Sequence, residues 1–292
     1  MNNFKKINTV FGWVTFLIAI AIYIMTLEQS VSLWDCGEFI SASYRLQVVH
    51  PPGAPLFLML GRLFSIFATP GTHEVAIAVN MLSAVFSAST VMFTFWITTY
   101  FAERMVDDDN KSKLLLVLGA GTVAALTNTF IDSFWFSAVE SEVYAMSSFF
   151  TALTFWAVLR WWKDADNAGA DRWLVFIAFM IGLALGTHML NLLVIPTVCL
   201  AYYFRKYPVT RNGIILALGA SALALAFVMK IVYPGIPWLM ATRNRIFVND
   251  FGQSFYSGSI AAVALILALS AYLMHYTYKT GRRNWNVIVM AA

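Results

Sequence analysis

Residues 8–27 read NTVFGWVTFLIAIAIYIMTL and contain no charged side chain. An apolar run of about 20 residues matches the length of an α-helix that crosses a hydrocarbon core of roughly 30 Å. Lys5 and Lys6 precede the run, and the positive-inside rule places them in the cytoplasm. The run lacks a convincing small-residue cleavage site, so we interpret it as a retained first membrane helix and not as a signal peptide.

Composition extends this interpretation to the whole chain. Of its 292 residues, 60% are hydrophobic and 12% are charged, whereas an ordinary soluble domain carries roughly 25% charged residues. The net charge is +4, but the basic residues form short clusters between apolar runs, which argues against a nucleic-acid partner. The two cysteines, Cys36 and Cys199, imply no disulfide framework. The sequence therefore predicts an all-α, polytopic transmembrane helix bundle.

We predict a single transmembrane domain, residues 1–292, with about eight spanning helices. The long spans are expected at residues 8–27, 75–101, 114–131, 143–162, 212–232 and 258–278. Two short helices within residues 173–204 are expected to meet near Thr187 and His188. Residues 285–292 resemble the start of a further helix. With basic clusters inside, residues 28–74, the stretch between 131 and 143, and residues 233–257 become outer loops.

The large first outer loop contains an apolar piece, residues 55–68, that includes Arg62. At about 14 residues it is too short to span a bilayer comfortably. We therefore expect a helix that lies along the outer surface of the membrane.

Two acidic pairs fall in the predicted outer loops. Asp35 and Glu38 belong to Trp34-Asp35-Cys36-Gly37-Glu38-Phe39, and three-residue spacing puts both on one helix face, with Arg45 available to pair with Glu38. Glu140 and Glu142 form the second pair. Carboxylates near a lipid boundary are costly unless they are solvated, paired or used. All four offer hard oxygen ligands for a divalent cation, although their spacing is not diagnostic of a metal site.

The alternative for the acidic pairs is helix capping. Ser32-x-x-Asp35 and Ser137-x-x-Glu140 both match a capping box, in which case Asp35 and Glu140 would only begin helices. Capping leaves Glu142 without a role.

Three further sets of polar residues lie near the same predicted boundary. His188 and Asn191 interrupt an apolar hairpin, and they form either a satisfied core pair or part of a cavity. Arg243 and Arg245 depart from the positive-inside trend, so they contact either lipid headgroups or a bound phosphate. His50 begins the rigid His50-Pro51-Pro52-Gly53 turn and is expected to face the same cavity.

Four motifs together resemble a known family. Trp34-Asp35-x-Gly37-Glu38-Phe39 with His50-Pro51-Pro52-Gly53-x-Pro55 resembles the N-terminal signature of a bacterial membrane-protein family long catalogued as a domain of unknown function. Glu140-Ser141-Glu142-Val143-Tyr144 and Gly186-Thr187-His188-x-x-Asn191 resemble other segments of that family. Its animal relatives are protein O-mannosyltransferases, and the family resembles the GT-C glycosyltransferases. The resemblance implies a GT-C-like bundle whose large first outer loop carries a surface helix.

The resemblance also implies an activity. A mannose-like sugar would pass from a polyprenyl-phosphate lipid donor to a hydroxyl of a translocated protein acceptor, in the bacterial inner membrane with the active site facing the periplasm. No cofactor is certain, and a divalent cation stays open. Asp35 would be the catalytic base, and Arg243 and Arg245 would bind the donor phosphate. Supporting or positioning roles would fall to Trp34, Glu38, His50, Glu140, Glu142, Tyr144, His188 and Asn191.

We prefer Asp35 to Glu38 as the base for three reasons. Trp34 offers a flat face to a sugar, Gly37 lets a ligand approach the backbone, and an ion pair would make Glu38 a weaker base. Two other functions stay open at this point. In a secondary transporter the outer carboxylates would bind a cation or substrate, although the inverted repeats common in transporters are absent. In a non-catalytic assembly subunit the acidic motifs would only cap helices.

Overall fold

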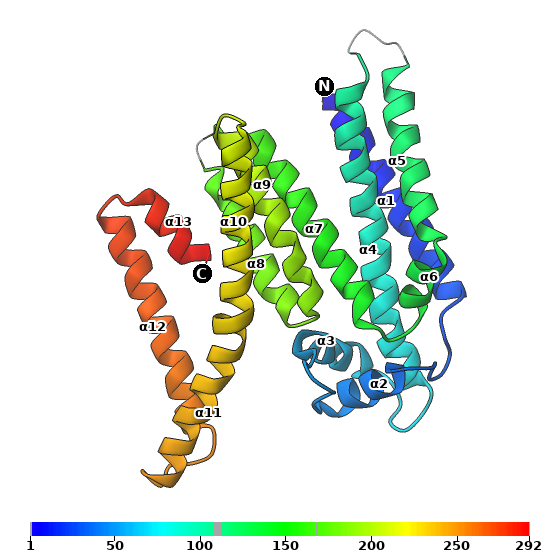
Figure 1. Ribbon diagram of the computed structural model, residues 1–292. Coiled ribbons are helices and arrows are strands. Elements are labelled where there is room, and N and C mark those ends of the chain that lie inside the picture. Colours follow the sequence, from blue (N-terminus) through cyan, green and yellow to red (C-terminus); the bar gives the residue numbers. More distant parts are fainter. Residues whose placement is uncertain (1, 108–111, 168, 292) are drawn as a thin grey trace. The chain divides into compact units, whose positions relative to one another are not determined.

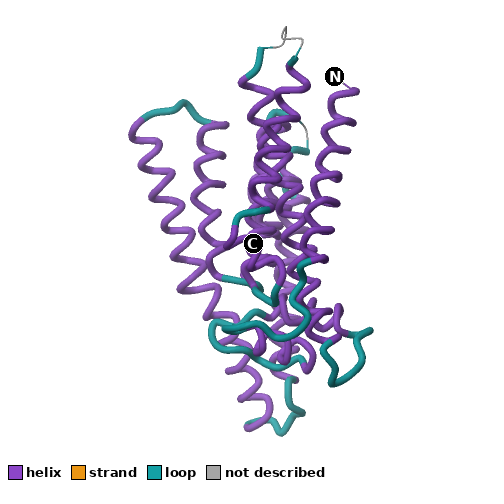
Figure 2. The backbone as a smooth tube through the Cα atoms, turned by 90° about the vertical axis from the view of Figure 1, so that its right-hand side faces the viewer, coloured by secondary structure: helices purple, strands orange, loops and turns teal. Residues whose placement is uncertain are grey.

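The computed structural model describes residues 2–107, 112–167 and 169–291 (Figure 1). Within these ranges every regular element is a helix, as Figure 2 shows by colour. The prediction of an all-α, polytopic bundle is confirmed. The chain divides into two compact units, Met1–Arg160 with Met180–Val194, and Trp161–Phe179 with Ile195–Ala292. The single-domain organisation stays a prediction.

The core of the first unit lies where three long helices pack together. Helix α4 (Glu74–Met105) contacts both α1 (Asn2–Met25) and α5 (Lys113–Thr129). Their shared core contains alanines beside larger side chains: Ala19, Tyr23, Ala84, Ala88, Val91, Phe95, Leu118 and Ala125. Small side chains allow helix backbones to approach closely, which is how helices in membranes gain packing energy.

Two short helices form the segment between α1 and α4, which is the predicted first outer segment of this unit. Helices α2 (Cys36–Arg45) and α3 (Pro55–Ser65) contact each other and the start of α4, at the end of the unit where α6 and α7 also meet (Figure 1). Gly61 permits this packing, because a Cβ atom there would lie 2.5 Å from Ser43 Oγ. A helix is therefore present where the apolar piece at residues 55–68 predicted one, while its position along a membrane surface stays a prediction.

The first unit is completed by shorter elements. Helix α6 (Asp132–Val139) follows α5, and α7 (Val143–Asp164) begins after a tight turn. Helix α8 (Asp171–Leu185), the 3₁₀ turn η1 (Met189–Leu193) and α9 (Val194–Lys206) form the predicted pair of short helices with a break near His188. Only residues 180–194 of this stretch belong to the first unit; the start of α8 and α9 from Ile195 onward belong to the second. The second unit continues through α10 (Arg211–Phe227), the π-helical turn η2 (Val228–Val232), α11 (Tyr233–Asn249), α12 (Ser257–Lys279) and α13 (Arg283–Ala291).

Five helices of the described chain are long and apolar enough to cross a membrane, or six if the bent pair α5–α6 counts as one span. They are Phe4–Met25, Glu74–Met105, Val143–Asp164, Arg211–Asn249 and Ser257–Lys279. Helices α8 and α9 have 15 and 13 residues and fall below the usual spanning length of ~17–25 residues. The count of about eight spans therefore stays a prediction.

Two predicted loops are wrong, because helices occupy them. Residues 132–139 form α6, and the expected outer loop at residues 233–257 is helical as far as Asn249. This stretch contains Pro234 and Pro237, but Pro234 lies in the first turn of α11, where its missing N–H is tolerated. The π turn at Val228–Val232 precedes it, and such local adjustments accommodate proline within membrane helices.

Candidate functional site

The N-terminus of α2 presents two carboxylates, and the loop that follows α2 presents a histidine. Asp35 occupies the N-cap position of α2 without a side-chain capping bond, and Glu38 lies in the first turn. Helix α2 ends at Arg45, and Leu46 adopts a left-handed conformation that reverses the chain. The His50–Gly53 turn follows, closed by the Gly53 N–H donating to the His50 carbonyl at 2.9 Å.

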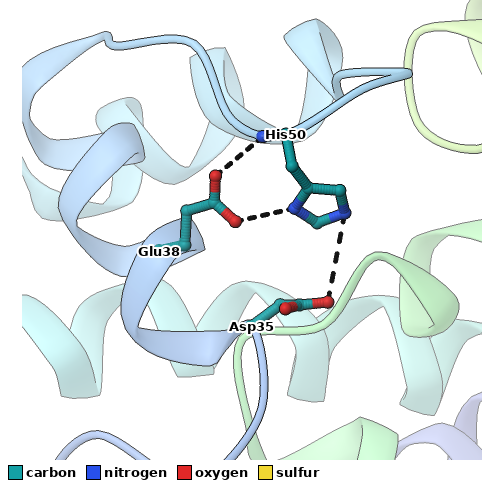
Figure 3. A group of neighbouring side chains, drawn as sticks. All are labelled: Asp35, Glu38 and His50. Carbon is teal, nitrogen blue, oxygen red and sulfur yellow. Dashed lines mark hydrogen bonds and ion pairs between the residues drawn. The ribbon is translucent and has the colours of Figure 1, made fainter.

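His50 lies between the two carboxylates (Figure 3). Its backbone N–H and its Nδ1 each lie 2.7 Å from a different oxygen of Glu38. Its Nε2 lies 4.0 Å from Asp35 Oδ2. The hydrogen bond to Glu38 raises the pKa of His50, and the same bond lowers the pKa of Glu38. These three residues, the exposed trio, therefore favour an imidazolium between two carboxylates.

The predicted ion pair of Glu38 with Arg45 is wrong. Glu38 pairs with His50, twelve residues later. The physical reason is the chain reversal at Leu46, which brings the His50–Gly53 turn back beside the first turn of α2.

A pocket opens beside the exposed trio, and its lining comes from three chain segments of the first unit. Asp35 and His50 contribute from the first outer segment, Glu142 and Tyr144 from the start of α7, and His188 from the break before η1. The rings of Tyr144 and His188 lie 5.4 Å apart between centroids. The structure thus brings together five predicted site residues that are separated by as many as 153 positions in the sequence.

The hydrogen bond and the burial of His188 favour one tautomer of its ring. Its Nδ1 accepts a hydrogen bond from the Leu190 backbone N–H at 3.1 Å, and burial lowers the pKa of His188. A neutral ring with an unprotonated Nδ1 carries its proton on Nε2. His188 can therefore donate a hydrogen bond from Nε2 to a sugar or phosphate oxygen.

Asn191 lies behind His188 and does not line the pocket. It is 2% exposed. Its amide donates to the carbonyls of Ala184 and His188, and its Oδ1 accepts from the hydroxyls of Ser147 and Thr151. The two donated bonds fix the turn that carries His188, and the two accepted bonds tie that turn to α7. Asn191 therefore acts on the pocket through that histidine.

Glu140 and Glu142 belong to a second group, the buried cluster, which also contains Ser32 and Cys36. Glu142 is 8% exposed, and its Oε1 accepts from the Cys36 thiol at 3.6 Å. Glu140 accepts a hydrogen bond from the Ser32 hydroxyl. Burial raises the pKa of Glu142 and of Cys36. One group thus packs both predicted acidic residues against the N-terminal side of α2.

Neither predicted capping box is formed, although Asp35 does occupy the N-cap position of α2. Ser32 bonds Glu140 and not the start of α2. Ser137 lies within α6 and donates to the Ser133 carbonyl, while α7 begins at Val143. Ser137 and Glu140 therefore form no capping box at the start of α7.

The other predicted site residues lie elsewhere. Trp34 is 92% exposed and outside the pocket lining. Arg243 and Arg245 lie on α11 in the second unit, so their phosphate-binding role stays a prediction. Donor atoms within 4.8 Å of one another, a spacing suited to a metal ion, occur in Asp35–Glu38–His50 and in Cys36–Glu140–Glu142. Metal dependence also stays a prediction.

Sequence reasoning missed two polar residues of this region. Cys36 was interpreted only in terms of disulfides, although it lies within the acidic motif. Thr187, which belongs to the motif that contains His188, lines the pocket beside that histidine. Asn80 is fully buried on α4, and the signal that could have found it is an amide within an apolar run.

Comparison with known proteins places this geometry in context. A family model for the N-terminal domain of the protein O-mannosyl-transferase TMEM260 matches residues 35–211, a range that contains every residue of the pocket lining. The protein O-mannosyl-transferase tmem260 of Dictyostelium discoideum is 28% identical over 143 residues, which cover 47% of this chain and 15% of that protein. The Mus musculus protein O-mannosyl-transferase TMEM260 is 28% identical over 165 residues, covering 56% and 21%. The chain thus spans about a fifth or less of these curated relatives, and no solved structure matches it.

Proposed function

Because the chain belongs to the family of the TMEM260 protein O-mannosyl-transferase N-terminal domain, we propose that it transfers a sugar to a hydroxyl group of a protein. The observation that carries the proposal is the convergence of Asp35, His50, Glu142, Tyr144 and His188 on one pocket. We propose a mannose-like sugar, a polyprenyl-phosphate donor, a GT-C-type mechanism and a site on the periplasmic face of a bacterial inner membrane. Nucleotide sugars are not expected on that side, which favours a lipid-linked donor.

Asp35 is the proposed general base. Its carboxylate takes the proton of a Ser or Thr hydroxyl on the acceptor. The hydroxyl oxygen then bonds to the anomeric carbon, the bond from that carbon to the phosphate oxygen breaks, and polyprenyl phosphate leaves with the electron pair. A positioned base of this kind contributes typically ~10²–10⁴-fold in rate.

The three carboxylates near the pocket differ in their suitability for this step. Glu38 is held twice by His50, which lowers its pKa and makes it a weaker base. Glu142 is buried and bonded by Cys36. The Asp35 side chain is 57% exposed, and its partner is His50 at 4.0 Å. Asp35 is therefore the carboxylate that an incoming hydroxyl can reach.

The remaining pocket residues suit a sugar phosphate. Tyr144 and His188 offer an aromatic surface, and His188 offers an Nε2–H donor. Arg243 and Arg245 on α11 are our proposed partners for the departing phosphate, because guanidinium groups bind phosphate oxygens in forked pairs. A divalent cation held by the Asp35 and Glu38 carboxylates, with His50 unprotonated, would supply further positive charge toward that phosphate.

The proposal is tested by assaying transfer from polyprenyl-phosphate mannose to a Ser/Thr peptide in membranes. We expect Asp35→Asn to reduce turnover by at least ~100-fold, the lower end for loss of a general base, while donor binding is nearly unchanged. The matched control is Asp132→Asn, an exposed aspartate in the first turn of α6, which should retain wild-type turnover. Full activity of Asp35→Asn would refute this role, whereas an absence of transfer by the wild-type protein would favour a transporter or a non-catalytic subunit.

A further inference from the structure

Asn80 is a buried amide on α4, remote from the pocket lining. It is 1% exposed. Its Nδ2 donates to the carbonyls of Glu28 at 2.8 Å and Ser30 at 3.3 Å, and its Oδ1 accepts from the Ser141 hydroxyl. A buried amide costs free energy unless its hydrogen bonds are made. This one uses its donors and its acceptor to join two loops that are distant in the sequence.

Asn80 joins the loop that precedes Asp35 to the Glu140–Glu142 turn. The Glu28 N–H donates to the Val139 carbonyl at 3.1 Å, which binds the loops to each other. Farther along the same two loops, Ser32 donates to Glu140 and Cys36 to Glu142. Asp35 lies between Ser32 and Cys36 in the sequence, so its backbone is fixed on both sides.

Helix α4 supports the second loop at another point. Ser83, one turn after Asn80, is 1% exposed, and its hydroxyl donates to the Glu142 carbonyl at 3.5 Å. Ser141 lies between Glu140 and Glu142 and is itself fully buried. Helix α4 therefore fixes the Glu140–Glu142 turn through Asn80 and Ser83. The two glutamates of that turn accept hydrogen bonds from residues before and at the start of α2.

We infer that Asn80 is a positioning residue for Asp35, which fixes the first outer loop against the Glu140–Glu142 turn so that the Asp35 carboxylate faces the acceptor hydroxyl. The inference rests on the proposed function. Asn80 touches neither substrate nor reacting atoms, and its effect passes through the loop. Misplacement of a catalytic group by about 1 Å can cost roughly 100-fold in rate.

The kinetic test uses Asn80→Ala in the transfer assay with polyprenyl-phosphate mannose. We expect kcat to fall by about 10- to 100-fold, with the KM for the donor within about twofold of wild type. The matched control is Ser87→Ala, seven residues later on α4, because Ser87 is fully buried and its hydroxyl has no hydrogen-bond partner. It should leave kcat unchanged. In an Asp35→Asn background, Asn80→Ala should cause no further loss of kcat, since the group it positions is gone.

A second readout is independent of activity. Cys36 is 1% exposed and Cys199 is partly exposed on α9, in the other unit. Labelling of both thiols with N-ethylmaleimide reports on the first outer loop and on the second unit, respectively. Asn80→Ala should accelerate labelling of Cys36 and leave that of Cys199 unchanged.

The outcomes separate the two proposals. An unchanged labelling rate at Cys36, or an equal rise at both cysteines, would overturn the inference, because Asn80 would then hold nothing or would support the whole fold. Loss of turnover in Asp35→Asn with full turnover in Asn80→Ala would also overturn it, while the proposed function would stand. Full turnover in Asp35→Asn would overturn the proposed role of Asp35 and, with it, this inference. An absence of transfer by the wild-type protein would instead overturn the proposed function, and Cys36 labelling would still report whether Asn80 fixes the loop.

Discussion

The exposed trio and the buried cluster both include residues at the N-terminus of α2, but they differ in how far their ionisable side chains are exposed to solvent. In the trio, the side chains of Asp35, Glu38 and His50 are 39–57% exposed. In the cluster, Glu142 is 8% exposed, and its partner Cys36 is 1% exposed. The trio is open to an incoming substrate, whereas Glu142 and Cys36, which help to fix the backbone, are closed off from solvent.

The pKa shifts follow the same division. A hydrogen bond from His50 lowers the pKa of Glu38, whereas burial raises the pKa of Glu142. A hydrogen bond to a carboxylate favours its charged form, and desolvation disfavours it. The pKa values of two glutamates near one pocket are therefore shifted in opposite directions, one by a charged partner and the other by burial.

The sharpest test of this contrast is sidedness, where the expected result is all or none. The exposed trio can act on translocated proteins only if the outer segments face the periplasm. In a background without native cysteines, an impermeant thiol reagent should label cysteines at His73 and Asn249 and should leave one at Asn167 unlabelled. All three positions are exposed. Labelling at Asn167 with protection at His73 would invert the topology and remove the periplasmic site.

A smaller effect is expected from the pair that orients the trio. Glu38→Gln removes the charge that holds His50, so the His50–Gly53 turn loosens. We expect donor affinity and turnover to fall together, by about 10-fold in kcat/KM, as for loss of a charge-assisted hydrogen bond. The control is Glu103→Gln near the other end of α4. If Glu38→Gln abolished turnover with intact donor affinity while Asp35→Asn stayed active, the roles of the two carboxylates would be exchanged.

The smallest effect concerns pH. The pKa of His50 is raised above its ordinary value of 6.5, so its stabilising bond is fully present below pH 6.5 and lost as pH rises through the raised value. The pKa of Glu38 is lowered from 4.5, so the bond is fully present above pH 4.5 and lost as pH falls through the lowered value.

The difference in Tm between wild type and His50→Gln should therefore be largest between pH 4.5 and 6.5 and should shrink at alkaline pH. Both groups are exposed, so the difference should be no more than a few degrees. Thermal unfolding of both proteins across pH 4–9 measures it. A difference that grew above pH 8 would show that His50 acts through packing and not through its charge.

Much of the fold followed from apolar run lengths, because a spanning helix has a fixed minimum length. Helices α1, α4, α7 and α12 begin and end within a few residues of the predicted spans, apart from the earlier start of α1. The errors at α6 and α11 have another origin. Acidic, proline and glycine residues favour loops locally, but they are tolerated in the first turns of helices, and Pro237 shows that α11 accommodates one in its interior.

For the site, the motifs predicted which residues gather but not which residues bond. Asp35, His50, Glu142, His188 and Arg243 were expected in one cavity. The first four line one pocket, whereas Arg243 lies on α11 in the second unit. The partner of Glu38 could not be predicted, because helix periodicity favours Arg45, whereas the chain reversal at Leu46 selects His50. Asn80 escaped for a similar reason, since its partners are backbone carbonyls and a serine that carry no sequence pattern.

The length of the continuous helix from Arg211 to Asn249 determines how far its arginines can lie above the hydrocarbon core of the membrane. Its 39 residues extend about 58 Å, nearly twice a hydrocarbon core of roughly 30 Å. With Arg211 at the inner boundary, the 32 residues to Arg243 reach about 48 Å. An upright helix would then raise Arg243 roughly 18 Å above the hydrocarbon. A tilt of about 40°, the upper end of the usual range, would lower it to roughly 7 Å, level with the phosphates of the headgroups. Leaning of this one helix would thus bring its arginines into or out of reach of a lipid phosphate.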